Sequence, residues 1–569
     1  MPLLDSKTLG PARLGFADEK DLDAFVAMLG KFERGEISAD AWKQFRLVNG
    51  VYSQRQEGDA MMVRVKIPQG VLTPAQLRAL ADVAERLSTG RGHITTRQNV
   101  QFHFVHLAQT DDALRVLAEA GLTTREACGN SVRNVTACPY AGASGLEPFD
   151  TTPYAEAVTR HLLRGPLSSS LPRKFKIAFG GCCGFDCVGA SFNDIGFLAR
   201  ERNGRPGFRV TVAGGLSTLR RTGILAHDFA PAEEVVDICE AVVRLFNRTG
   251  DRQHRHRARL KFVVEKLGAE EFLRQYHEER ASVPPRPVSP GPPGALRPVP
   301  TPFRRSPHPG FEEFVRTNVR PQRDPELAAV TIRIPLGDLT AAQFHALADI
   351  AEEFSAEREL RTTVEQNALL RFVGRSHLAS VHAALAAAGL ARPGALSISD
   401  VVSCPGAYSC RLAVTQSRGM ADALTTALAD RGESLPIKIS GCPNGCGQHY
   451  VAGIGLQGSV RKVDGRAVPQ YHLYVGGELG AEQARFGRLA AKVPARKVPE
   501  AVRRLADLAV REASPGESAA QVLGRLSPQR VSEVLADLEP LDHPAPEDFV
   551  DLGEQKAFEV QTTEGECAA

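Results

Sequence analysis

The chain has 569 residues, more than one hydrophobic core usually serves, so several domains are expected. Its 69 basic and 66 acidic residues leave a net charge of +3 without a long basic run, which argues against a nucleic-acid partner. Residues 1–23 lack a signal-peptide core, and the apolar stretch 378–391 is too short to span a bilayer. Eleven cysteines in so long a chain are no disulfide scaffold, and their clustering is typical of ligands. We therefore expect a cytoplasmic protein that does not engage a membrane.

The predicted elements of the first half of the chain recur, in the same order, in the second half. A strand, the sequence LTPAQ at 72–76 and a helix pattern recur as a strand, LTAAQ at 339–343 and a helix pattern. The sequence TTRQN at 95–99 precedes a strand with alternating apolar residues, as TTVEQN does at 362–367. This duplication predicts an α/β protein with mixed sheets and a pseudo-two-fold axis, in which a ligand can lie between the halves.

A proline-rich segment at 282–308 separates the two halves. Its prolines exclude a helix or a central strand, so it is interpreted as an extended linker.

Four cysteines of the second half form two close pairs, Cys404 with Cys410 and Cys442 with Cys446. Thiolates suit an iron–sulfur cluster and zinc alike. Five residues separate the first pair, more than a structural zinc site usually leaves, and glycines beside the second pair let the backbone wrap closely around a bulky group. The sequence favours a cluster over zinc, and four unrelated buried cysteines are the weaker interpretation.

Four motifs in a fixed order add a resemblance that covers about residues 51–458. They are TTRQNVQFH at 95–103, LPRKFK at 171–176, the Cys-x5-Cys pair and GCPNGC at 441–446. Together they resemble the siroheme-dependent nitrite and sulfite reductase family, which implies an internally duplicated fold with ferredoxin-like half-domains. The resemblance also implies a [4Fe-4S] cluster on the four second-half cysteines and a siroheme whose iron shares the sulfur of Cys446.

The resemblance assigns further side chains to the siroheme, whose carboxylates need cationic and polar partners. The expected cofactor contacts are Thr95, Arg97, Gln101, His103, Asn444 and Cys446. Some relatives carry Arg where this chain has His93, so that contact is not carried over.

Four other cations match the substrate-binding set of the family. They are Arg64, Arg133, Lys174 and Lys176. Arginine offers a planar fork for oxyanion oxygens, and lysine can deliver protons. Relatives that resemble nitrite reductases tend to have Asn in place of Lys176, and the more highly charged sulfite suits a second lysine. We therefore expect the six-electron reduction of sulfite to sulfide, of the assimilatory type.

Alternatives stay open at this point. The same cofactors could reduce nitrite to ammonia, a related cluster enzyme serves corrinoid biosynthesis, and a non-catalytic iron–sulfur electron carrier or redox sensor is the alternative from another class. The four cations predict an anion pocket. An electron carrier has no need of such a pocket, so the cations argue against a carrier. The sequence has neither a ferredoxin-type cysteine run nor a convincing flavin site, so a ferredoxin or a flavoprotein subunit is expected as electron donor.

The duplication and the resemblance divide the chain into six parts. These are an N-terminal segment with the first ferredoxin-like half-domain (1–125), a first siroheme and substrate domain (126–281), the linker (282–308), a second ferredoxin-like half-domain (309–395), a [4Fe-4S] and siroheme domain (396–540) and an acidic tail (541–569). The tail is expected to be disordered or to lie on the surface.

Cysteines of the first half fall where the repeat places cluster ligands. Cys138 aligns with Cys404, Cys183 with Cys442, Cys187 with Cys446, and Ser144 with Cys410. We interpret them as a relict of the duplication; a second cluster, with Cys128 or Cys182 as substitute ligand, is the alternative. Some relatives link a Tyr to a Cys near the haem, and Tyr52 with Cys138 is the candidate pair here.

Overall fold

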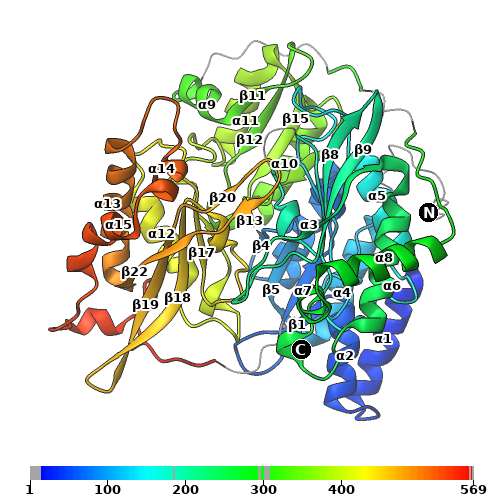
Figure 1. The fold of residues 1–569 in the computed structure, drawn as a ribbon, viewed down its shortest axis with the longest axis horizontal. Coiled ribbons are helices and arrows are strands. Elements are labelled where there is room, and N and C mark those ends of the chain that lie inside the picture. Colours follow the sequence, from blue (N-terminus) through cyan, green and yellow to red (C-terminus); the bar gives the residue numbers. More distant parts are fainter. Residues whose placement is uncertain (1–14, 183–185, 292–295, 300–307, 563–565, 567–569) are drawn as a thin grey trace.

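The computed structural model describes residues 15–182, 186–291, 296–299, 308–562 and 566. This part of the chain contains four five-stranded sheets and one two-stranded sheet (Figure 1). Two of the large sheets are built mainly from each half, so the duplicated α/β architecture expected from the sequence is confirmed.

The first and third sheets are equivalent antiparallel sheets. The first has the order β1 (Val51–Ser53), β2 (Ala60–Val65), β5 (Val100–His106), β4 (Arg91–Ile94) and β13 (Asp338–Thr340). The third has the order β11 (Val319–Pro321), β12 (Leu327–Ile332), β15 (Ala368–Gly374), β14 (Leu360–Thr362) and β3 (Val71–Leu72).

Each half contributes one short strand to the edge of the equivalent sheet of the other half. β13 pairs with β4, with Leu339 opposite Gly92, and β3 pairs with β14, with Leu72 opposite Leu360. The exchange ties the halves together through backbone hydrogen bonds, which a hinged pair of domains would lack.

Two glycines allow the exchanged strands to approach so closely. Gly70 and Gly337 have φ angles of +75° and +71°, which L side chains rarely adopt. A Cβ atom on Gly70 would lie 2.5 Å from the oxygen of Thr362, and one on Gly337 would lie 2.6 Å from the oxygen of Ile94.

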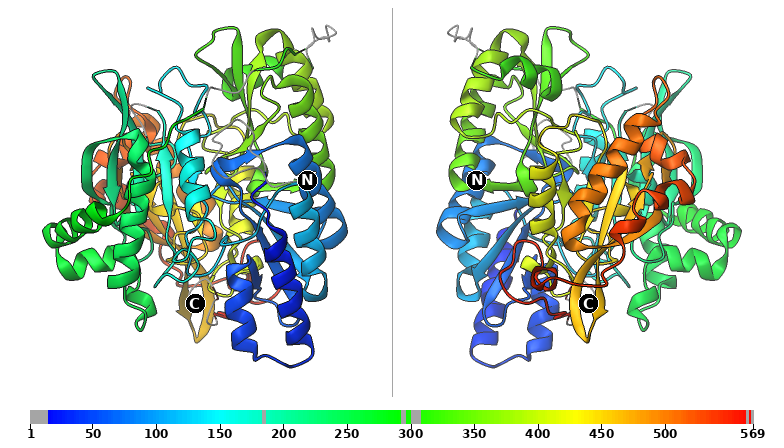
Figure 2. Two further views of the ribbon diagram at one scale, coloured as in Figure 1. Left: turned by 90° about the vertical axis from the view of Figure 1, so that its right-hand side faces the viewer. Right: turned by 90° about the vertical axis from the view of Figure 1, so that its left-hand side faces the viewer.

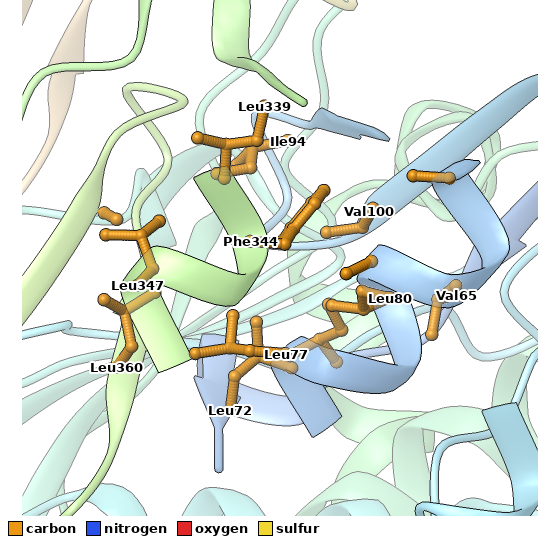
Figure 3. Packing of buried hydrophobic residues seen from close by; sticks show 14 of the residues in the cluster. Val65, Leu72, Leu77, Leu80, Ile94, Val100, Leu339, Phe344, Leu347 and Leu360 are labelled. Carbon is orange, nitrogen blue, oxygen red and sulfur yellow. The ribbon is translucent and has the colours of Figure 1, made fainter. Parts of the chain in front are cut away.

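The helices α3 (Pro74–Leu87) and α10 (Ala341–Phe354) follow the exchanged strands and pack against each other. Both begin with a reciprocal capping box, which Thr73 forms with Gln76 and Thr340 forms with Gln343. Apolar side chains of both halves interdigitate between them in one continuous core (Figure 3). Each ferredoxin-like unit therefore buries its apolar surface against the other.

The second and fourth sheets are equivalent mixed sheets. The second has the order β10 (Ile224–Pro231), β9 (Arg205–Val212), β8 (Ile195–Arg202), β7 (Ile177–Gly180) and β6 (Thr136–Ala137). The fourth has the order β16 (Val402–Ser403), β17 (Ile437–Ser440), β18 (Ile454–Val463), β19 (Arg466–Val475) and β22 (Arg488–Pro494). In both, the first strands along the chain are parallel, so their carboxyl ends meet at one edge.

Helices cover these two sheets with separate cores. α5 (Thr152–Leu162) and α6 (Val235–Thr249) contribute to the core of the second sheet, and α12 (Ser417–Ala427) and α13 (Val498–Arg511) to that of the fourth. The remaining helices are α1 (Glu19–Glu33), α2 (Ala39–Val48), α4 (Thr110–Glu119), α7 (Leu260–Leu267), α8 (Ala269–Ser282), α9 (Phe311–Asn318), α11 (Leu378–Ala387), α14 (Ala519–Arg525) and α15 (Pro528–Glu533). The small sheet pairs β20 (Glu478–Leu479) with β21 (Ala484–Arg485). In Figure 2 the helices that follow the second sheet (green) lie at one side of the molecule, and the N-terminal helices (dark blue) lie at its bottom.

Apart from Ser282, which ends α8, the described residues of the linker form no helix or strand, as predicted. Most described residues of the tail are exposed or half-buried, so the tail lies on the surface, which is one of the two expected outcomes. It is not disordered, since Phe549 and Asp551 are buried and Asp551 accepts a hydrogen bond from the backbone of Gln416 at 2.7 Å. Near the end of the chain, Glu566 forms a buried ion pair with Arg46. Apolar and paired residues spaced through an acidic segment explain why it packs, although its composition suggested otherwise.

Candidate functional site

The four second-half cysteines follow the strands whose carboxyl ends meet in the fourth sheet. Cys404 comes directly after β16 and donates its backbone N–H to Ile439 of β17 at 3.1 Å, while Cys442 comes two residues after β17. Cys410 lies at the end of a short turn, where its N–H donates to the oxygen of Gly406 at 3.0 Å. The backbone N–H of Gly441 donates to the sulfur of Cys404 at 3.3 Å.

The four thiols interact electrostatically. Burial raises the pKa of Cys442, and the neighbouring Cys446, Cys404 and Cys410 raise it further, so the thiols resist simultaneous ionisation. A bound cation removes this conflict, because a metal stabilises the thiolate form. Cys446 is exposed, whereas Cys442 is buried, so one sulfur remains accessible for a second ligand.

Glycines bring the backbone close to these cysteines, as the sequence predicted. A Cβ atom on Gly447 would lie 1.9 Å from the oxygen of Ile439, and one on Gly441 would lie 2.8 Å from the oxygen of Thr415. The loop can therefore wrap the sulfurs only with glycine at these positions.

The motif at 95–103 contacts the second-half cysteines directly. Thr96 donates its hydroxyl to the backbone oxygen of Cys446 at 2.7 Å, and the amide of Gln448 donates to the oxygen of Thr96 at 3.2 Å. Thr95 has a local role, because its hydroxyl accepts the N–H groups of Arg97 and Asn99, both at 3.2 Å. Thr96 was missed by the sequence analysis, although it belongs to the quoted motif.

Arg97 reaches from this motif into the first half. Its guanidinium donates to Asn193 Oδ1 at 2.9 Å and to the oxygen of Asn134 at 2.6 Å. Its Nε is buried and has no hydrogen-bond partner among the described residues. A buried donor aimed at no acceptor is what an anionic cofactor group would satisfy.

Positive charge gathers around Arg97. Burial lowers its pKa to about 9, and Arg133, Arg259 and Arg64 lower it further, while Asp194 opposes them. One carboxylate is outnumbered by the surrounding cations, so the site attracts anions.

Lys176 belongs to the same cluster. Burial holds its pKa well below the usual value, and Arg97, Arg259 and Lys174 lower it further, while Cys446 raises it. Lys174 and Lys176 flank Phe175, which forms a β-bridge with Val132, so the extended backbone turns both side chains to one face.

Arg64 and Gln101 lie opposite each other on β2 and β5. With its amide in the orientation that satisfies both groups, Gln101 accepts from Arg64 Nη2 at 2.6 Å. Arg64 also stacks over Tyr52, 5.2 Å from the ring centroid. Arg133 donates to the oxygen of Gly129 at 2.7 Å, so backbone carbonyls fix its direction.

His103 is buried and its Nδ1 lies 3.0 Å from Gln54 Oε1, while its Nε2 lacks a partner among the described residues. Burial lowers its pKa to about 3, so it is neutral at pH 7. Both ring nitrogens of His93 have protein partners, since Nδ1 lies 2.9 Å from Asp338 and Nε2 lies 3.2 Å from Gln366. Asn444 is exposed at the rim, between the two cysteines of its loop.

Arg259 and Asp194 are site residues that sequence reasoning missed. Arg259 donates to Asp194 Oδ2 at 2.7 Å, and the same oxygen accepts the backbone N–H of Lys176 at 2.9 Å. Neither residue lies in a motif, and the chain contains many similar charges, so no signal in the sequence distinguishes them.

The donor set fits both groups implied by the sequence. Four converging thiols suit a cluster, and an accessible Cys446 beside the unsatisfied buried donor of Arg97 suits a carboxylate-rich cofactor. The fold and site thus define an oxidoreductase with an iron–sulfur centre next to an anion pocket.

Comparison with known proteins agrees with this class. The family model described as the nitrite and sulphite reductase 4Fe-4S domain matches residues 128–284 and 395–535, and the nitrite/sulfite reductase ferredoxin-like half domain matches 52–120 and 320–388. The chain belongs to the nitrite and sulfite reductase family.

Individual relatives span most of the chain. A ferredoxin–nitrite reductase of Leptolyngbya laminosa is 31% identical over 495 residues, covering 84% of this chain and 91% of its own. Sulfite reductase [ferredoxin] 2 of Mycolicibacterium paratuberculosis is 29% identical over 500 residues, covering 83% and 86%. The structure of the Mycobacterium tuberculosis NirA protein has a TM-score of 0.74 at 27% identity, covering 89% of this chain and 95% of that one.

Among the described residues, no helix combines the length and apolar character that crossing a membrane requires.

The first-half cysteines occupy two separate places. Cys128 packs with Tyr52 in one buried cluster, whereas Cys138 packs with Cys182 in another. The prediction that Cys138 is the partner of Tyr52 is therefore wrong, because Cys128 is the buried cysteine that packs in the cluster of Tyr52. Cys183 lies outside the described residues.

Proposed function

We propose that this protein reduces sulfite to sulfide with six electrons. The observation that carries the proposal is the cation cluster in which Lys176 lies near Arg97, Arg259 and Lys174. Near neutral pH a substantial share of sulfite is the dianion, whereas nitrite is a monoanion, so Coulomb attraction in a partly dehydrated pocket favours sulfite.

The proposed cofactors are a [4Fe-4S] cluster and a siroheme. Cys404, Cys410, Cys442 and Cys446 would hold the cluster, and Cys446 would also bind the siroheme iron. The siroheme carboxylates would find donors in Arg97, Gln101 and Asn444, with His103 as a further contact and with Thr95 shaping the turn that presents them. When bound, the pair supplies one-electron redox chemistry next to the anion pocket.

The chain's own residues would bind the anion and hold its protons. Arg64 and Arg133 offer planar donors whose directions are fixed by protein acceptors. Lys174 and Lys176 would supply protons, since burial and neighbouring cations weaken the hold of Lys176 on its proton. Conversion of SO₃²⁻ to HS⁻ consumes six electrons and seven protons and releases three waters.

A ferredoxin is the proposed electron donor. Several relatives carry ferredoxin in their names, among them nitrite and sulfite reductases. Nitrite is the second candidate substrate, because the ferredoxin–nitrite reductases of Leptolyngbya laminosa and Synechococcus elongatus are 31% identical to this chain. Two sulfite reductases of Mycolicibacterium paratuberculosis are 29% and 28% identical.

The test compares sulfite and nitrite reduction by the purified holoprotein with a reduced artificial donor. We expect a higher kcat/KM for sulfite. Lys176→Asn should lower it by about 10- to 100-fold, the scale of one charge-assisted hydrogen bond, and should change nitrite reduction less.

Two further variants complete this test. Lys176→Arg keeps the charge and should retain most of the sulfite affinity, and Lys492→Asn, on the exposed side of β22, should change neither activity. Preference of the wild type for nitrite, or equal losses for both substrates in Lys176→Asn, would contradict the assignment.

A further inference from the structure

A second group of cysteines converges in the first half, away from the site described above. The sulfurs of Cys138, Cys182 and Cys187 all lie within 4.8 Å of one another, and those of Cys138 and Cys182 are 3.6 Å apart. The hydroxyl of Ser144 lies 3.7 Å from the sulfur of Cys182. Cys138 and Cys182 are buried.

Backbone register shows that this group is the pseudo-symmetric counterpart of the second-half cluster. Cys138 donates its N–H to Phe179 of β7 at 2.9 Å, as Cys404 does to Ile439 of β17. Cys182 comes two residues after β7, as Cys442 does after β17. The alignment of Cys183 with Cys442 was therefore one residue out of register.

The other two positions correspond as well. Ser144 donates its N–H to the oxygen of Tyr140 at 3.0 Å, as Cys410 does to Gly406. Cys187 and Cys446 each precede by two residues a left-handed residue that begins a 3-10 turn. Three thiols and one hydroxyl thus occupy the four ligand positions.

The spacing of the sulfurs suits a single ion. Two thiolates on one tetrahedral zinc, with Zn–S bonds of about 2.3 Å, lie about 3.8 Å apart. In a cubane each thiolate binds a different iron, so the sulfurs stand farther apart. Among the described residues, the first-half trio is the one metal-ligand group within 4.8 Å, and no three of the second-half sulfurs are so close.

The surroundings exclude a second tetrapyrrole next to this group. Val364 occupies the position that Thr96 has in the first half, and this buried side chain packs in an apolar cluster with Cys187. Glu365 stands where Arg97 would offer a cation for carboxylates. The cationic pocket beside Cys446 therefore has no counterpart beside the first-half cysteines, where apolar and acidic side chains take the equivalent positions.

Hydrogen bonds from neighbouring side chains hold the loops that carry the thiols in place. Gln98 accepts the N–H of Ala137 at 3.0 Å, and the buried guanidinium of Arg371 donates to the oxygen of Pro139 at 3.3 Å. On the other side, the carboxylate of Asp186 accepts the N–H groups of Val188 and Ser191 at 3.3 and 3.1 Å. Thiols held in place before binding suit a structural metal.

We propose that Cys138, Cys182 and Cys187 bind one zinc ion as thiolates, with Ser144 or a water in the fourth position. The three thiols release their protons on binding, and no electron is transferred. The metal would tie the loops after β6 and β7 together, so the ancestral cluster position would have become a structural site.

The first experiment measures metals in the purified holoprotein. We expect about one zinc per chain in addition to the about five irons of one cluster and one siroheme. X-ray absorption at the zinc edge should show sulfur ligands at about 2.3 Å. Both measurements use the wild-type protein, so the proposal stays testable if variants fail to fold.

Variants locate the ion. Cys182→Ser should lose the zinc and keep the iron content and visible spectrum, whereas Cys239→Ser, a buried cysteine on α6, should keep both metals. The proposal is overturned by absence of zinc with about four additional irons, by a Cys138–Cys182 disulfide in metal-free protein, or by zinc that persists in Cys182→Ser. Each outcome is independent of whether the substrate is sulfite or nitrite.

Discussion

At the residue scale, Asp194 holds together cations that would otherwise repel one another. Its Oδ2 accepts both Arg259 and the backbone of Lys176, and its charge is the one that raises the pKa of Arg97. The carboxylate is completely buried, yet it faces more positive charges than it can neutralise. The remaining charge is available to an anionic ligand, so one acid both stabilises the pocket and leaves it cationic.

Arg259 should therefore act on stability and on substrate binding in separable ways. Arg259→Gln removes a charge from the anion pocket, so we expect KM for the oxyanion to rise about tenfold in steady-state assays. It also leaves Asp194 buried without an ion pair, which should cost about 3 kcal/mol and lower the thermal midpoint.

The double variant Asp194→Asn with Arg259→Gln separates the two effects. It removes the uncompensated charge, so the thermal midpoint should recover while KM stays high. Recovery of KM together with the thermal midpoint would mean that Arg259 does not contribute charge to substrate binding. A thermal midpoint that stays low would mean that the unpaired carboxylate of Asp194 is not the cause of the lost stability.

Some of these residues were predictable from the sequence and others were not, for a physical reason. Arg97 lies within a motif of nine residues that resembles a family, whereas Arg259 comes from a turn before α7 and joins the site only through tertiary packing. Thr95 was assigned to the cofactor, although its hydroxyl stabilises the turn and Thr96 contacts Cys446. Neighbouring positions of a turn point in different directions, which the sequence does not specify.

At the element scale, the duplication preserves unusual backbone as well as sequence. Left-handed residues recur in pairs, with Gln98 matching Gln366 and Phe104 matching Phe372. Non-glycine residues in this region are strained, so their recurrence indicates that both strands need the same bulged path. Side chains follow the pattern, because Gln98 and Gln366 each accept the N–H of the residue that precedes a cysteine, Ala137 and Ser403 respectively.

Gly70 should be far less tolerant of substitution than a glycine with the same backbone conformation in open space. Gly70 and Gly90 both have φ of +75°, but a Cβ on Gly90 meets no atom within 4 Å. Gly90→Ala should cost about 1 kcal/mol of backbone strain, and Gly70→Ala about 3 kcal/mol more, because its methyl group forces β3 away from Thr362.

Thermal unfolding followed by circular dichroism measures this difference. Gly90→Ala is the matched control for strain alone. Equal shifts of the thermal midpoint in the two variants would show that the close approach of β3 to β14 contributes nothing to stability.

Strand and helix patterns were predictable from local sequence, and the two helices expected after the repeated Leu-Thr pairs are present as α3 and α10. The exchange of β3 and β13 was not predictable. A strand of two or three residues carries no information about which of two similar edges it joins, and that choice depends on contacts distant in sequence.

At the scale of the whole molecule, the two halves form one folding unit. The linker between them contributes little to holding them together. Their shared core extends from Phe25 to Leu390, and the exchanged strands cross between the halves. The linker, by contrast, has exposed residues such as Ser289 and Pro290 and forms no helix or strand where it is described.

Cleavage of the linker should therefore leave the molecule intact. A protease site inserted after Pro290 would give two fragments, which we expect to elute together in size-exclusion chromatography and to keep the visible spectrum of the holoprotein. Separation would require exposing the apolar faces of α3 and α10, at about 25 cal/mol for each Å². The uncut protein with the same insertion is the control. Fragments that separate without denaturant would show that the linker holds the halves together and that the exchanged strands do not.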